Sequence, residues 1–88
     1  MRTVSILVKG RVQGVFFRRC TINNASKNGI CGFVKNTLQG DVYIEAEGDE
    51  PAIEKFIKWC HKGSPASRVE SVEVNELQFV NYTGFIMR

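Results

Sequence analysis

The chain has 88 residues, 43% of them hydrophobic, and a formal net charge of +3 at pH 7. This length and composition fit one small globular domain over residues 1–88 and exclude a disordered or multidomain chain. No apolar run approaches the roughly 18 residues that a membrane span requires, so we expect no membrane contact.

The charge is distributed unevenly along the chain. Residues 1–40 contain seven basic residues and no acidic one, which gives +7, whereas residues 41–88 contain five basic and nine acidic residues, which gives −4. This asymmetry indicates an anionic ligand near the first part of the chain. The alternative is that the two sets of side chains interleave in space and cancel the field.

Hydrophobic patterns in the first half predict a strand, a helix and a hairpin. Apolar and polar residues alternate over residues 3–8, which predicts a strand. A weaker helical pattern covers residues 16–28. Two further strands, at 30–37 and 41–47, are joined across the short glycine-containing turn at 38–40, as in a hairpin.

The second helix has the clearest pattern in the chain. Asp49 offers acidic capping, Pro51 suits the first turn, apolar residues recur at i, i+3, i+4 and i+7, and Gly63 ends the helix. The run at 69–79 is rich in β-branched and aromatic residues and predicts a strand with a bulge where its alternation slips. Residues 84–87 add a short last strand.

The element order is therefore β-α-β-β-α-β with a terminal β. We expect an α+β fold, a ferredoxin-like split β-α-β sandwich in which two helices cover one face of an antiparallel sheet of four to five strands. In this arrangement the first strand pairs with the third, and the loop after the first strand faces the segment around the second.

A basic loop with two glycines joins the first strand to the first helix. It reads Gly10-Arg11-Val12-Gln13-Gly14-Val15-Phe16-Phe17-Arg18. Backbone N–H groups that turn into a helix start point together at the positive end of the helix dipole, and glycine lets a ligand approach the main chain. Arg18 adds a planar charged group suited to phosphate oxygens. The loop is a candidate anion-binding site, with a plain strand-to-helix turn as the alternative.

Asn36 is the second candidate site residue, at the polar end of the strand over residues 30–37. Its amide carries a donor and an acceptor, so it can orient a water molecule without being charged. A turn asparagine ahead of the hairpin is the alternative. In the expected fold Arg18 and Asn36 converge, with no serine, cysteine or carboxylate placed as nucleophile or base. Such a site can cleave only a phosphate that has a good leaving group. That phosphate must also carry enough negative charge to take a proton from the attacking water itself.

Nucleotide, metal and redox sites are not indicated. The loop lacks the Gly-Lys-Ser/Thr of a Walker loop and the glycines of a dinucleotide fingerprint. The one histidine, His61, has no acid at ligand spacing and only Cys60 as a nearby thiol, so we expect an exposed ring, no metal and no cofactor. Cys20, Cys31 and Cys60 lack paired C-x-x-C spacing, and we expect them to be buried small side chains in a reducing, cytoplasmic setting.

The loop at 10–18, taken with Gly32-Phe33-Val34-Lys35-Asn36-Thr37, resembles the two signatures of the acylphosphatase family. The similarity covers nearly the whole chain and continues through Gly40, Gly48, Phe56, the Gly63-Ser64-Pro65 stretch, Val69 and Phe85. Ser64-Pro65 stands where the family usually has a Gly-Pro pair, which puts stability rather than activity in question.

The resemblance implies a small free-standing acylphosphatase, which hydrolyses the carboxyl-phosphate bond of acyl phosphates to a carboxylate and inorganic phosphate without a metal or cofactor. It implies two catalytic residues: Arg18 binds the phosphoryl group and Asn36 orients the attacking water. The implied substrate-binding positions are the loop amides and a supporting threonine, at Gln13, Gly14, Val15, Phe16, Phe17, Arg18 and Thr37. Positioning and electrostatic stabilisation then supply most of the catalysis.

Two alternative functions stay open from the sequence. A small RNA-binding module has a similar topology, and Gly32-Phe33-Val34 resembles part of such a motif, although it lacks the flanking aromatics and lies on the second strand. The other is an acyl-phosphate-handling domain of a larger carbamoyl-transfer protein. Because the chain starts at methionine and ends just after the last strand, we expect a free-standing enzyme. We take a monomer as the default state, and we expect a small-molecule acyl phosphate as the substrate and no nucleic acid as a partner.

Overall fold

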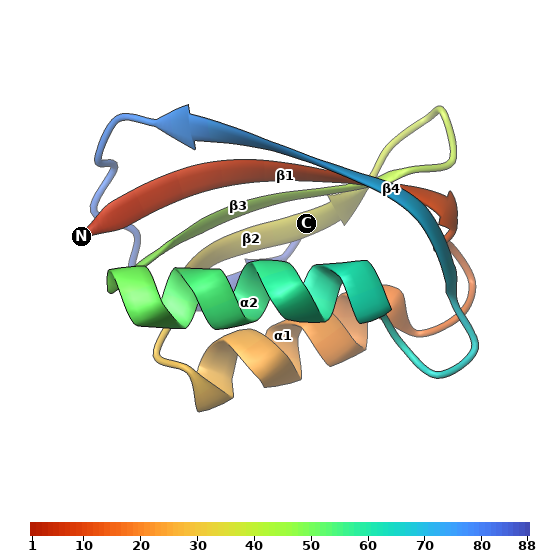
Figure 1. Cartoon of the computed structure of the whole chain (residues 1–88), viewed down its shortest axis with the longest axis horizontal. Coiled ribbons are helices and arrows are strands. Elements are labelled where there is room, and N and C mark those ends of the chain that lie inside the picture. Colours follow the sequence, from red (N-terminus) through yellow and green to blue (C-terminus); the bar gives the residue numbers. More distant parts are fainter.

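Five strands and two helices make up the computed structural model, which describes all residues from 1 to 88. The elements are β1 (Arg2–Arg11), α1 (Phe17–Lys27), β2 (Cys31–Asn36), β3 (Val42–Gly48), α2 (Glu50–Lys62), β4 (Arg68–Leu77) and β5 (Phe85–Met87). The strands form one sheet in the order β4-β1-β3-β2-β5, and both helices lie on the same face of it (Figure 1). This arrangement confirms the expected α+β sandwich and the pairing of the first strand with the third. Neither helix has the length and apolar character needed to cross a membrane.

The last strand departs from the expected antiparallel sheet. The first four strands pair antiparallel, but β5 runs parallel to β2. The path of the chain explains the difference. Because β4 lies at the opposite edge and ends where β2 begins, the connection over residues 78–84 crosses that end of the sheet, and β5 starts beside the start of β2. The sheet is therefore mixed, and its fifth strand brings the C-terminal residues next to β2.

The predicted bulge in β4 lies where β1 leaves the core. Lys9 pairs with Ser71 but Gly10 pairs with Val69, so Glu70 is the extra residue. Gly10 has a φ of 131°, and a Cβ there would collide with the β4 backbone. A bulge bends and twists its strand pair. Here the bend comes immediately before the basic loop.

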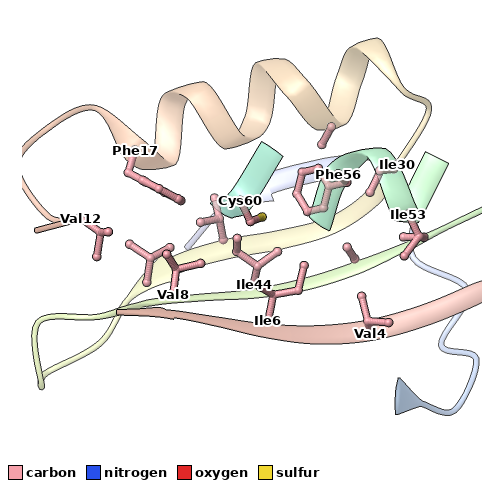
Figure 2. Close-up of a cluster of buried hydrophobic side chains, with 14 of the residues drawn as sticks. Val4, Ile6, Val8, Val12, Phe17, Ile30, Ile44, Ile53, Phe56 and Cys60 are labelled. Carbon is pink, nitrogen blue, oxygen red and sulfur yellow. The ribbon is translucent and has the colours of Figure 1, made fainter. Parts of the chain in front are cut away.

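The core fills the space between the sheet and the two helices. Val4, Ile6 and Val8 alternate on the helix side of β1 and are fully buried. The other members of the buried cluster are Val12, Val15, Phe17, Ala25, Ile30, Val34, Val42, Ile44, Ala46, Ile53, Phe56 and Cys60. Figure 2 shows Val12 and Phe17 at one end of this cluster. The start of α1 is therefore anchored on the core.

Two local predictions are wrong in part. Cys60 is buried as expected, whereas Cys20 and Cys31 are only half-buried. Cys31 alternates with the core-facing residues of β2 and so lies on the outer face of the sheet. The second helix begins after Asp49 as predicted, but the Asp49 side chain makes no capping hydrogen bond. Its carboxylate can favour the helix only through the dipole.

A buried carboxylate ties the C-terminal connection to the sheet. Glu47 is 2% exposed and accepts hydrogen bonds from the Thr3 hydroxyl and from the backbone N–H groups of Val80 and Tyr82. Burial alone would raise the pKa of this carboxyl, but the hydrogen bonds outweigh burial and hold the pKa below its usual 4.5. Most side chains from 78 to 84 are exposed, so Glu47 fixes the segment that leads into β5.

We expect Glu47→Gln to lower the free energy of unfolding by about 1–3 kcal/mol, because the amide matches the buried donors poorly. A carboxyl with a lowered pKa in the folded state stabilises the fold above its ordinary pKa and loses that contribution as the pH falls. Wild-type stability should therefore decline below about pH 4.5, and this decline should be smaller in Glu47→Gln.

Urea unfolding followed from neutral to acidic pH measures both effects. Glu70→Gln is the matched control, because Glu70 is exposed on the β4 bulge. A Glu47→Gln variant as stable as Glu70→Gln at neutral pH would contradict the account.

Candidate functional site

A pocket of about 330 Å³ lies at the end of the sheet where β1 and β2 both terminate. In Figure 1 the loop between β1 and α1 and the turn between β2 and β3 lie at this same end. The lining consists of Val12, Gly14, Phe16, Phe17, Arg18, Arg19, Asn36 and Met87. The structure therefore brings the two predicted catalytic residues, Arg18 and Asn36, into one pocket.

The pleat of β2 places Asn36 on the helix side of the sheet. Successive residues of a strand point to opposite faces. Val34 is fully buried in the core, so Asn36, two residues on, shares its face. Asn36 is the last residue of β2 and is half-buried. Its side chain therefore emerges at the rim of the core, where the pocket opens.

The start of α1 leaves backbone donors free for a ligand. Phe16 is the N-cap, with φ 60° and ψ 21°; no side chain caps the helix, and its first turn contains no acidic residue. The helical hydrogen bonds begin with the Cys20 N–H, which donates to the Phe16 carbonyl oxygen. The N–H groups of the four residues before Cys20 thus have no acceptor within the helix. All four of those residues line the pocket.

Gln13 clamps the loop to the β2–β3 turn. Its side-chain amide donates to the carbonyl oxygens of Thr37, at 2.9 Å, and Asp41, at 2.8 Å. The Thr37 hydroxyl in turn accepts the N–H of Asp41 at 3.1 Å. One side chain thus joins the two segments that carry the predicted catalytic residues. Gln13 and Thr37 themselves lie beside the pocket and not in its lining.

The helix α2 and its connection to β4 both contact the segment between β1 and α1. The buried Ser64 hydroxyl donates to the carbonyl oxygen of Val15 at 2.8 Å. The ring of Phe17 packs against Trp59 of α2, with the ring centroids 5.3 Å apart. Val15 itself is buried in the core and lies outside the pocket lining. Ser64 stands where the resembled family usually has glycine, and its hydroxyl contributes a buried hydrogen bond to the loop.

The charges of the two halves of the chain interleave only in part. Arg2 and Lys9 of the first half form ion pairs with glutamates of the second half, at N···O distances from 2.5 to 3.9 Å. Neither Arg18 nor Arg19 forms an ion pair. The pocket thus keeps two arginines without a carboxylate partner, and the charge asymmetry of the sequence persists there.

Three lining residues are absent from the set predicted from the sequence: Val12, Arg19 and Met87. Arg19 directly follows Arg18 in the first turn of α1, and this adjacency is the available signal. Val12 closes the pocket from the core side. Met87 reaches the pocket through the parallel pairing of β5 with β2, for which the sequence carries no local signal.

Two other sequence signals lead to no site. No group of three or more His, Cys, Asp or Glu side chains is placed to hold a metal ion, and His61 is exposed as predicted. Phe33, the aromatic residue of the RNA-like motif, is 5% exposed. The Arg88 guanidinium lies 4.0 Å from its ring centroid, and Tyr43 and Tyr82 pack with centroids 6.0 Å away. Phe33 therefore offers no free face for stacking a base.

Comparison with known proteins identifies relatives of the whole chain. The acylphosphatase family model matches residues 4–87. An acylphosphatase of Shewanella amazonensis is 53% identical over 76 residues, which are 86% of this chain and 84% of the relative. The crystal structure of acylphosphatase from Bacillus subtilis has a TM-score of 0.97 and 38% identity, covering 100% of this chain and 99% of that one.

The same fold also occurs within a longer protein. The crystal structure of HypF from T. kodakarensis matches with a TM-score of 0.87 and 32% identity, covering 100% of this chain but 12% of that one. The family match over residues 4–87 and the similarity to whole relatives settle the assignment. The chain belongs to the acylphosphatase family.

Proposed function

We propose that this pocket hydrolyses acyl phosphates to a carboxylate and inorganic phosphate. The observation that carries the proposal is that Arg18, the uncapped start of α1 and Asn36 line one pocket. Membership in the acylphosphatase family supports the same reaction. The RNA-binding alternative gains no support from the family or from the covered ring of Phe33.

In this proposal the phosphoryl group binds to Arg18 and to the backbone N–H groups of the loop from Gln13 to Arg18. Free helix N-terminal donors and the helix dipole favour an anion. The guanidinium of Arg18 matches two phosphate oxygens at once and has no carboxylate competing for it. In phosphoryl transfer the charge spreads over the equatorial oxygens in the transition state, so these fixed donors lower the barrier.

Asn36 holds the attacking water. Its carbonyl oxygen accepts a hydrogen bond from the water and its NH₂ group donates one, which fixes the direction of the water lone pair. None of the lining residues carries a carboxylate, an imidazole, a thiol or an amine. The proton of the water therefore passes to a phosphoryl oxygen of the substrate. The new bond joins the water oxygen to phosphorus, and the bond to the acyl oxygen breaks with its electron pair on the departing carboxylate.

Gln13 and Thr37 act as positioning residues. Gln13 holds the phosphate loop at a fixed separation from the turn after Asn36, through its two hydrogen bonds to carbonyl oxygens. Thr37 stiffens that turn through the N–H of Asp41. A small displacement between two reacting groups lowers the reaction rate, because attack requires the two groups to lie near van der Waals contact.

We also infer a cytoplasmic monomer that acts on small molecules, with residues 1–88 as one acylphosphatase domain. The family match over residues 4–87 supports the domain assignment. The three cysteines are free, as a reducing compartment keeps them.

Arg18→Ala and Asn36→Ala should each lower kcat/KM for benzoyl phosphate by about a hundredfold or more, the scale seen when a fixed transition-state donor is removed. Arg18→Lys should restore only part of the loss, because an ammonium group lacks the planar pair of donors. Rates are measured with and without chelator, and we expect no effect of the chelator. Circular dichroism and thermal unfolding check that the variants fold.

Arg11→Ala and Asn23→Ala are the matched controls, because both side chains are exposed and lie outside the pocket. They should retain wild-type rates. Full activity of Asn36→Ala would refute the role of the amide, and an inactive, folded wild type would refute the proposed function.

Gln13→Ala should reduce kcat for benzoyl phosphate by about tenfold, because the loop and the turn lose their shared clamp. The loss should lie mainly in kcat, since the phosphate-binding donors stay in place. Gln39→Ala, a change of the same side chain in the exposed β2–β3 turn, should have no effect. Equal rates for the two variants would show that the clamp does not contribute to catalysis.

A further inference from the structure

The pocket is larger than a phosphoryl group needs. Its volume of about 330 Å³ falls within the range of small-molecule sites. Arg18, Asn36 and the helix start account for the phosphoryl group and the water. The remaining lining at the mouth includes two large apolar side chains that stay in water: Phe16, 73% exposed, and Met87, 44% exposed. We call these two residues the apolar rim.

The backbone, and not side-chain burial, places both residues of the apolar rim. Met87 lies opposite Val34 in the parallel β5–β2 pair, and the next residue, Arg88, donates its N–H to the Val34 carbonyl oxygen at 2.8 Å. Phe16 has a left-handed φ of 60°, which is unfavourable for an aromatic residue. Strained residues that persist at a site often serve its function. Exposed apolar carbon gathered at one pocket likewise points to a ligand.

We propose that the apolar rim contacts the acyl group of the substrate, so that the protein favours acyl phosphates with an apolar acyl group. The proposal rests on the proposed function, because it takes the phosphoryl group to lie on Arg18 and the amides. The acyl group is joined to that phosphoryl group through one oxygen and so extends toward the mouth of the pocket. Covering the Phe16 ring and the Met87 side chain then contributes favourable free energy in proportion to the apolar area removed from water.

Arg19 is the competing determinant at the same mouth. Its charged side chain lines the pocket and is exposed. A contact with Arg19 would favour acyl groups that carry a second negative charge. An exposed guanidinium is hydrated and screened by salt, whereas exposed apolar carbon gains free energy when a ligand covers it. The observations therefore favour substrates with an apolar acyl group over substrates whose acyl group carries a second negative charge.

The test compares kcat/KM for benzoyl phosphate, acetyl phosphate and succinyl phosphate among variants. The ratio of benzoyl to acetyl phosphate should fall about five- to tenfold in Met87→Ala, mainly through KM, as expected for lost apolar contact. Met87→Gln keeps the side-chain length but not its apolar character, and it should lower the ratio as well. Phe16→Gly, which tolerates the left-handed backbone and adds no capping side chain, should act in the same direction.

Ile86→Ala is the matched control. Ile86 is 51% exposed and precedes Met87, but it pairs with Phe33 and lies on the outer face of the sheet. It should leave the ratio unchanged. If the Met87 variants hydrolyse benzoyl and acetyl phosphate with the wild-type ratio, the apolar rim is refuted while the proposed function stands.

Two further outcomes separate the remaining possibilities. A wild type that prefers succinyl phosphate, with the preference lost in Arg19→Ala, would overturn the apolar class in favour of a charged one. A folded wild type that hydrolyses none of the three substrates would overturn the proposed function itself.

Discussion

The register between β2 and β3 decides on which side of the sheet Asn36 emerges. Val34 pairs with Ile44, and both are fully buried, so the core locks this register. A slip of one residue would turn Asn36 to the outer face and bring Lys35 to the helix side. Gln13 then joins the loop to the turn that follows β2. The pairing that builds the core therefore also sets the geometry of the pocket.

The pocket is formed mainly by residues at the ends of helices and strands, because the small core uses most of the other apolar residues for packing. Almost every periodic apolar residue packs between the sheet and the helices, as expected for a chain of 88 residues. Val12 and Phe17 belong to both the core and the pocket lining, and most of the other lining residues lie at the ends of elements: the first turn of α1, the last residue of β2 and the last residue of β5. Ser64 and Trp59 hold the underside of the loop from α2 and its connection. Packing against the core thus holds the backbone donors that we propose bind the phosphoryl group, and such preorganisation is the condition for electrostatic catalysis.

The elements and the meeting of Arg18 with Asn36 could be predicted, because periodicity and topology determine them. The alternation at Val4, Ile6 and Val8 is local, and the split β-α-β order brings the first loop to the end of the second strand.

The parallel pairing of β5 could not be predicted. It depends on a long connection held by the buried Glu47, and a strand of three residues has too little pattern to reveal its partner. Met87 is absent from the sequence-based site for that reason. The contacts of Gln13 escaped prediction because side-chain bonds to distant carbonyl groups follow from tertiary packing and not from spacing.

A titration of the ¹⁵N-labelled protein with inorganic phosphate tests most directly whether the phosphoryl site and Asn36 share one pocket. Phosphate is the product of the proposed reaction and should occupy the free donors at the start of α1. We expect saturable chemical-shift changes for the backbone amides from Gly14 to Arg19 and for the side-chain amide of Asn36, with none on the outer face around Phe33 and Tyr43. Shifts confined to other surfaces, or loop shifts that leave the Asn36 amide untouched, would contradict this expectation.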